Sequence, residues 1–274
     1  MPSSTPLPDT ASESRLSKVP QVTLIFWIIK IFCTTLGETG GDAVTMSWLK
    51  ADAPGLDPQS KYLAYLAGTA IFAVIFLAAV AVLVMAKKFH PFLYWITIIA
   101  TTTVGTTMAD FADRSLGIGY TGGSLTLFVL LMASLGVWYW SEGSISVNTV
   151  SKPKVEMFYW VTIMFSQTLG TALGDWTADS AGLGYSGAAI IFGSLLAVVA
   201  ALHFWTKISN TALFWAAFIL TRPLGAVVGD FLDKPLDHGG LNLSRYTASG
   251  ALAVLVIACI LIFPQRPGKH PARI

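Results

Sequence analysis

The sequence predicts an all-α integral membrane protein of about eight transmembrane helices, built from four parallel two-helix repeats. Apolar residues make up 54% of the 274 residues and charged residues 12%, and the mean hydropathy is +0.65. A water-soluble domain with this composition would aggregate. The second observation is a set of aromatic, glycine and aspartate positions that recurs four times along the chain.

The chain is predicted to divide into two tails and one membrane domain. Residues 1–20 are rich in Pro, Ser and Thr and lack the apolar stretch of a secretory signal, so we expect a disordered cytoplasmic tail. Residues 21–264 form a single transmembrane domain. Residues 265–274 form a basic cytoplasmic tail.

Eight segments are apolar and long enough to cross the membrane, which takes roughly 17 to 25 residues for about 30 Å of hydrocarbon. Four of them, the even helices, are almost free of charge: 62–86, 125–140, 188–205 and 246–263. Between these lie four odd helices that carry polar residues: 22–46, 93–111, 157–176 and 211–231. Eight crossings place both termini on one side.

Basic residues indicate which side that is. Ten fall on the side of the termini: Arg15, Lys18, Lys87, Lys88, Lys152, Lys154, Lys207, Arg266, Lys269 and Arg273. Five fall on the other side: Lys50, Lys61, Arg114, Lys234 and Arg245. The positive-inside tendency therefore predicts that both termini are cytoplasmic.

The internal repeat is visible when four tryptophans are aligned. Each is preceded by an aromatic residue, and the aligned residues are Trp27, Trp95, Trp160 and Trp215. Ten positions later the chain has Gly37, Gly105, Gly170 and Gly225, and fifteen positions later Asp42, Asp110, Asp175 and Asp230. The repeats span approximately 22–90, 91–150, 155–208 and 210–264.

Because each repeat has two crossings, the four odd helices run in one direction. They are expected to form a pseudo-fourfold or two-by-two bundle, with the even helices outside it and facing lipid. Recurring glycines four residues apart, such as Gly170 and Gly174, favour close helix packing.

The four repeat aspartates are predicted to share one depth. With each tryptophan in the cytoplasmic interface belt, the aspartates lie roughly 22 Å further along, near the outer boundary of the hydrocarbon. Four like charges at one depth favour a cation among them. We therefore expect Asp42, Asp110, Asp175 and Asp230, with Glu38 one turn inward, to bind an ion.

Further polar residues continue this face inward, since spacings of three, four and seven keep residues on one side of a helix. The predicted polar lining is Thr34, Thr35, Thr102, Thr103, Thr106, Gln167, Thr168 and Thr171. Lys30 and Arg222 are the candidate gating or counter-charge residues, and an ion pair of Arg222 with Glu38 is expected. That pair is either a structural clamp or a gate that a cation or proton opens.

Oxygen donors indicate a hard cation such as manganese, magnesium or calcium, or a proton, because His and Cys clusters are missing from this face. The alternative for the aspartates is that each bonds backbone N–H groups of its linker. A second acidic set, Asp113, Asp179 and Asp233, forms either an outer vestibule or a solvated loop face. Tyr120, Tyr185 and Trp176 leave open a third reading, a carrier of an organic cation.

Several classes have no support in the sequence. There is no phosphate-binding glycine loop, zincin motif or nucleophile elbow, so we expect no enzyme and no cofactor. The net charge of +2 does not indicate nucleic-acid binding. Cys33 and Cys259 fall within predicted crossings and are expected to stay reduced.

The segment 18–42, which contains the Thr-Thr-x-Gly-Glu-x-x-x-Asp block from Thr34 to Asp42, resembles a bacterial family of uncharacterised multi-pass membrane-anchored proteins. The resemblance covers nearly the whole chain from Lys18 to Phe263. It implies a bacterial inner-membrane location and an eight-span fold.

The predicted function is transport of a hard metal cation, with manganese as a candidate, in exchange for protons. The divalent cation would be the substrate, and the expected partners are that cation and the lipid bilayer, with a homo-oligomer left open. The alternative is a structural or sensory membrane protein in which the carboxylate ring locks the helices.

Overall fold

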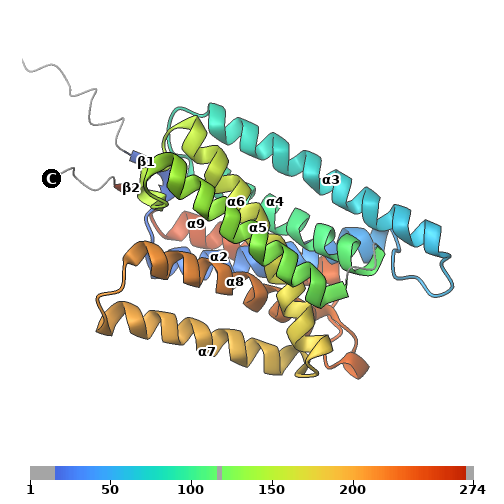
Figure 1. Cartoon of the computed structure of the whole chain (residues 1–274). Helices are drawn as coiled ribbons and strands as arrows, with labels where there is room; N and C mark the ends of the chain where they lie inside the picture. Colours follow the sequence, from blue (N-terminus) through green and yellow to red (C-terminus); the bar gives the residue numbers. More distant parts are fainter. Residues whose placement is uncertain (1–15, 116–118, 270–274) are drawn as a thin grey trace, which may run out of the picture.

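A computed structural model of the chain describes residues 16–115 and 119–269. Within these residues the fold is all-α, as predicted, with eight α-helices (Figure 1). The helices are α2 (Leu24–Asp42), α3 (Pro58–Met85), α4 (Pro91–Asp110), α5 (Gly119–Glu142), α6 (Pro153–Asp175), α7 (Gly184–Trp205), α8 (Asn210–Asp233) and α9 (Arg245–Ile262).

Short elements join and flank these helices. Three π-helices follow α2, α4 and α6 directly: η1 (Ala43–Trp48), η2 (Phe111–Ser115) and η4 (Trp176–Ser180). Two 3₁₀ turns are η3 (Val147–Thr149) and η5 (Leu236–His238), and two short strands are β1 (Leu16–Pro20) and β2 (Pro267–Lys269).

Seven helices of the described part of the chain are long and apolar enough to cross a membrane, judged by length and composition. The exception is α6, which carries Glu156 and Gln167, both wholly buried within the protein. Since the polar groups of α6 are enclosed by neighbouring helices, a low mean hydropathy is compatible with its place in the interior.

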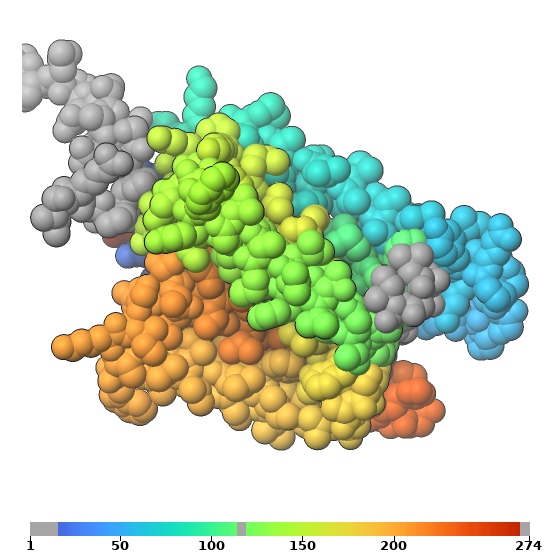
Figure 2. Space-filling model, viewed as in Figure 1, coloured from blue at the N-terminus to red at the C-terminus, as the bar shows by residue number. Residues whose placement is uncertain are grey.

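The first helix of each repeat, which the sequence analysis calls an odd helix, is α2, α4, α6 or α8, and these four inner helices form a closed ring. Helix α2 packs on α4, α4 on α6, α6 on α8, and α8 returns to α2. The inner helices are largely buried and the outer ones largely exposed: 72% of the apolar stretch of α4 is buried, against 11% of that of α7. The outer helices α3, α5 and α7 form much of the surface seen in Figure 2.

Each outer helix packs mainly against the inner helix of the following repeat, not of its own. Helix α3 lies on α4, α5 on α6 and α7 on α8, and α9 closes the cycle by packing on α2 (Figure 1). The four repeats are therefore interlocked around the ring. Removing one repeat would leave the inner helix of the next one uncovered.

The repeated aromatic pairs form a buried cluster at the end of the ring where the inner helices begin. The aromatic residue before each tryptophan contacts the tryptophan of the next repeat: Phe26 with Trp95, Tyr94 with Trp160, Tyr159 with Trp215, and Phe214 with Trp27. The hydroxyls of Tyr94 and Tyr159 lie 2.6 Å apart. This end of the ring is filled by side chains.

Three of the four tryptophans expected in an interface belt are enclosed by the protein. Trp95, Trp160 and Trp215 are at most 4% exposed and lie inside the protein, while Trp27 is partly buried. The physical reason is the ring itself, which offers each indole a neighbouring aromatic ring to pack against.

The two ends of the described chain pair with each other. Strands β1 and β2 are antiparallel and lie at the aromatic end of the bundle (Figure 1). Residues 16–20 form a strand, which corrects the expected disorder over these five residues, and residues 267–269 of the predicted basic tail form its partner strand. Residues 1–15 and 270–274 lie outside the described part.

Lys18 of β1 ties this strand pair to the bundle. Its ammonium group lies 2.8 Å from Glu156 of α6 and donates to the carbonyls of Leu83 and Val84 at the end of α3. The carboxyl-terminal carbonyls of α3 thereby gain the donor that a helix end lacks.

Candidate cation site

The repeat glycines set the distance between neighbouring inner helices. A Cβ atom added at Gly105 would lie 3.0 Å from the Gln167 backbone, and one at Gly229 would lie 2.7 Å from the Glu38 Cβ. The glycine ten positions after each tryptophan faces the residue seven positions after the next tryptophan: Gly37 faces Thr102, Gly105 faces Gln167, Gly170 faces Arg222, and Gly225 faces Thr34. Equivalent positions therefore lie at equivalent levels around the ring.

Arg222 lies between all four inner helices. One nitrogen of its guanidinium, Nη2, has three acceptors within hydrogen-bonding distance, Glu38 Oε2 at 2.9 Å, Thr106 Oγ1 at 2.6 Å and Thr171 Oγ1, which share its two N–H groups. These three acceptors come from α2, α4 and α6 and occupy the same position of their repeats, where the fourth repeat has Ala226. The expected ion pair between Arg222 and Glu38 is present, and both side chains are buried.

The remaining lining residues divide into two groups. The hydroxyls of Thr35, Thr103 and Thr168 donate to carbonyls of their own helices four residues earlier, and Thr34 bonds α2 and the Thr221 carbonyl of α8. By contrast, the Thr102 hydroxyl and both amide atoms of Gln167 have no hydrogen-bond partner among the described residues. Thr102 and Gln167 occupy the same position of their repeats as Arg222, one helical turn inward of the level of Glu38, Thr106 and Thr171 that its guanidinium reaches.

Lys30 does not join the carboxylates. It is wholly buried, and its ammonium group lies 4.2 Å from the centre of the Phe218 ring. Eight residues separate it from Glu38, which corresponds to roughly 12 Å along a helix. Within the described residues it forms no ion pair and no hydrogen bond through Nζ, so its contacts do not support a role as counter-charge to Glu38.

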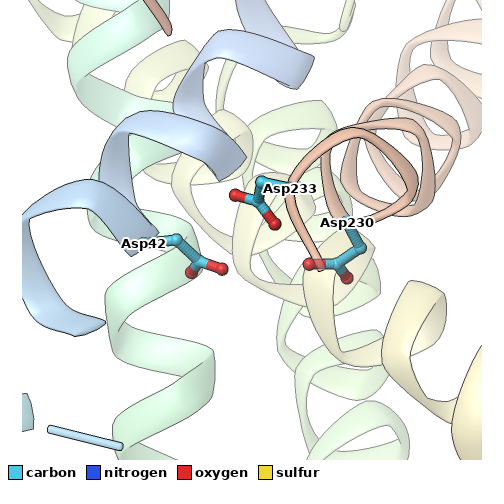
Figure 3. A group of neighbouring side chains, drawn as sticks. All are labelled: Asp42, Asp230 and Asp233. Carbon is cyan, nitrogen blue, oxygen red and sulfur yellow. The ribbon is translucent and has the colours of Figure 1, made fainter. Parts of the chain in front are cut away.

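Three carboxylates gather where the inner helices end. Asp42 of α2 and Asp230 and Asp233 of α8 are each at most 5% exposed, and one oxygen from each lies within 4.8 Å of the others. Figure 3 shows their carboxyl groups converging from the two helices. We call Asp42, Asp230 and Asp233 the acidic cluster.

The cluster differs from the predicted ring of four aspartates. Asp110 and Asp175 are buried at the ends of α4 and α6, as the repeat requires, but they are not members of the three-carboxylate group. Glu38 is also outside it, because its carboxylate bonds Arg222. Asp233, which we expected in a vestibule or a solvated loop, is a member.

A change in helix type explains the role of Asp233. Helices α2, α4 and α6 become π-helical directly after their repeat aspartates, whereas α8 stays α-helical through Asp233. Residues three apart on an α-helix share a face, so Asp230 and Asp233 point toward the same space. The spacing of these two aspartates in the sequence was the available signal.

Two basic residues border the acidic cluster. Lys234 Nζ lies 2.6 Å from Asp42 Oδ2 and 3.1 Å from Asp230 Oδ1. Arg245 Nε lies 3.6 Å from Asp233 Oδ2 and 4.0 Å from Asp42 Oδ2. The sequence places both basic residues on the outer side and Lys234 directly after Asp233, but their contacts with Asp42 and Asp230 were not predicted.

Some oxygens of the cluster have no hydrogen-bond donor. Among the described residues nothing donates to Asp42 Oδ1 or to either oxygen of Asp233. A buried carboxylate that lacks donors is costly unless it is paired or binds a cation. The donor set consists of carboxylate oxygens, which are ligands for hard cations such as Mn²⁺, Mg²⁺ and Ca²⁺.

The fold and the buried charges define an all-α protein of four internal repeats, with most of its helices apolar enough to cross a membrane. The chain belongs to the family described as a repeat of unknown function (DUF347), which matches residues 25–89, 93–144, 158–209 and 213–265. No curated protein and no solved structure matches the chain.

Proposed function

We propose that this protein is a multi-pass membrane transporter that moves a hard metal cation, with Mn²⁺ as the first candidate. The observation that carries the proposal is the acidic cluster, in which three buried carboxylates from two inner helices converge at one end of the ring. Buried carboxylates in membrane helices are costly, and they commonly mark ion pathways.

The membrane arrangement in this proposal has eight crossings, with α6 as the eighth. Large apolar side chains on the outer helices support it, since Leu77, Ile190 and Phe204 are each more than 60% exposed and would otherwise face water. The distribution of Lys and Arg favours cytoplasmic termini. Because the termini and the acidic cluster lie at opposite ends of the bundle, this orientation places the acidic cluster on the outer side. The resemblance noted in the sequence favours a bacterial inner membrane.

Two barriers along the ring support alternating access. From the cluster inward, the first is the guanidinium of Arg222, held by Glu38, Thr106 and Thr171. The second is the aromatic cluster, where the Tyr94 and Tyr159 hydroxyls are in contact. A cation bound at the cluster would cross only when both barriers rearrange, and protonation of Glu38 would release Arg222 and couple transport to protons.

A structural or sensory role is the second candidate. Its support is that the acidic cluster and Glu38 both have basic partners in the protein. In that case these groups would lock the helices, and the buried carboxylates would stabilise the fold without binding a substrate.

Transport of Mn²⁺ into liposomes separates the two candidates. Purified protein is reconstituted with an entrapped dye that Mn²⁺ quenches, and we expect quenching well above that of empty liposomes. Asp233→Asn should reduce the rate to background, because it removes one ligand and the single negative charge that Lys234 and Arg245 leave unmatched. Asp237→Asn changes an exposed carboxylate at the same end and should leave the rate unchanged.

The result that contradicts transport is equally direct. If liposomes with the wild-type protein take up no more Mn²⁺, Mg²⁺ or Ca²⁺ than empty ones, and Asp233→Asn only lowers the melting temperature, the structural role is the better account.

A further inference from the structure

Lys234 places a positive charge where a metal ion would lie. Its ammonium nitrogen is within hydrogen-bonding distance of carboxylate oxygens from two different helices, at 2.6 Å from Asp42 and 3.1 Å from Asp230. The side chains of both aspartates are at most 5% exposed, so the ammonium neutralises charges that water cannot reach.

The backbone of Lys234 is held by hydrogen bonds, while its side chain is partly exposed to solvent. Its N–H donates to the Asp230 carbonyl at 2.8 Å, and its carbonyl accepts from the Asn242 N–H at 2.9 Å. The side chain is 12% exposed, in contrast to the buried aspartates. A lysine has four rotatable side-chain bonds, so the ammonium can leave the cluster without movement of the helix.

Arg245 is held differently. Its closest distances to the cluster are 3.6 and 4.0 Å, and it also donates to Ser47 at 3.2 Å and lies 3.7 Å from Asp52. Because other groups share it, Arg245 can stay in place while the cluster exchanges its cation.

We propose that Lys234 is a tethered cation that occupies the acidic cluster in the absence of substrate, and that a divalent metal ion binds by displacing its ammonium group. This inference rests on the proposed cation transport. Asp233 supports it independently, because both of its buried oxygens lack hydrogen-bond donors among the described residues and lie where they could bind the incoming ion.

The charges of the cluster define the substrate class. Three carboxylates with Lys234 and Arg245 leave one net negative charge, and departure of the ammonium leaves two. A divalent ion balances that charge, whereas a monovalent ion only replaces the ammonium and gains nothing in charge. The site should therefore select divalent over monovalent cations.

The displacement is tested by the Mn²⁺ concentration that gives half of the maximal rise in melting temperature of the protein in detergent. Lys234→Met removes the competing charge and keeps the apolar stem. We expect its half-maximal concentration to fall by roughly tenfold or more, since hydrogen bonds to a charged group no longer compete with the metal. Without metal, this variant should melt below the wild type.

Two further variants control for charge and for unrelated change. Lys234→Arg keeps a displaceable positive charge and should keep the wild-type concentration or raise it. Lys50→Gln removes the charge of an exposed lysine at the same end and should leave the concentration unchanged. If Lys234→Met does not fold, the wild-type protein still tests the proposal: bound Mn²⁺ should increase labelling of Lys234 by an amine reagent, measured by mass spectrometry.

The outcomes separate this inference from the proposed function. If Mn²⁺ stabilises the wild type but Lys234→Met needs the same or more of it, or if Mn²⁺ leaves the labelling of Lys234 unchanged, Lys234 does not compete and cation binding stands without it. If Mn²⁺, Mg²⁺ and Ca²⁺ stabilise neither protein, both the inference and the cation site are wrong.

Discussion

At the scale of single residues, Arg222 links all four repeats. Its guanidinium bonds one side chain from each of the other three inner helices, at the level where its own repeat has Ala226. Among the described residues, neither Glu38 nor Arg222 forms an ion pair with any other charged group. Each side chain is therefore the main reason that the other can be buried.

Replacement of Arg222 by Met should destabilise the protein by about 3–5 kcal/mol, because Glu38 would be left as an uncompensated buried charge. The double variant Arg222→Met/Glu38→Gln removes both charges and should recover most of that loss. The free energy of unfolding in detergent, measured for the wild type, both single variants and the double variant, gives the coupling. A double variant no more stable than Arg222→Met would contradict this pairing.

At the scale of helices, small residues decide how closely the inner ring packs. Gly170 lies against the side-chain stem of Arg222, and a Cβ atom added at Gly170 would also lie 3.1 Å from Cδ of the Pro223 ring. A larger residue there would separate α6 from α8 and displace Arg222 from its three acceptors. The close packing of the ring and the polar layer inside it thus depend on each other.

Gly170→Ala should therefore cost about 1–3 kcal/mol of stability through overpacking. The matched control is Gly136→Ala on the outer helix α5, where an added Cβ meets no atom within 4 Å. That variant should be neutral or stabilising by up to about 1 kcal/mol, since alanine is the better helix former. Melting temperatures of the two variants test this, and equal losses would show that the ring does not need a glycine at 170.

At the scale of the whole molecule, the repeats close into a cycle. Each outer helix covers the inner helix of the following repeat, and α9 covers α2, so the last repeat completes the first. The β1–β2 pair joins the two ends of the described chain at the aromatic end of the ring. Aromatic side chains fill the end of the ring where the inner helices begin, and the acidic cluster lies at the end where they finish.

Much of this arrangement could be predicted because parallel repeats place equivalent residues at equivalent depths. Counting from each tryptophan placed Glu38, Thr106 and Thr171 on one polar face, and the expected partner of Glu38 was Arg222. Counting along a helix does not say which neighbour an outer helix will choose. The linkers are long enough for an outer helix to pack on the inner helix of its own repeat or of the next one. The interlocked packing was therefore not predictable from the sequence.

The acidic cluster was only partly predictable for a related reason. The repeat fixes the depth of its aspartates but not the directions in which they point. Asp42 and Asp230 meet because α2 and α8 are neighbours, and Asp233 joins them because α8 stays α-helical where the other inner helices become π-helical. Lys234 has Met46, Arg114 and Asp179 as its counterparts, so comparison of the repeats gave no sign of its position.

The most direct test of a cation site is equilibrium binding of Mn²⁺ to the purified protein, followed by the electron paramagnetic resonance signal of the free ion. The acidic cluster predicts saturable binding of a single ion per chain, which Mg²⁺ or Ca²⁺ competes for and which Asp42→Asn and Asp233→Asn abolish. A free Mn²⁺ signal that the wild-type protein does not reduce, or that these variants reduce equally, would contradict the account.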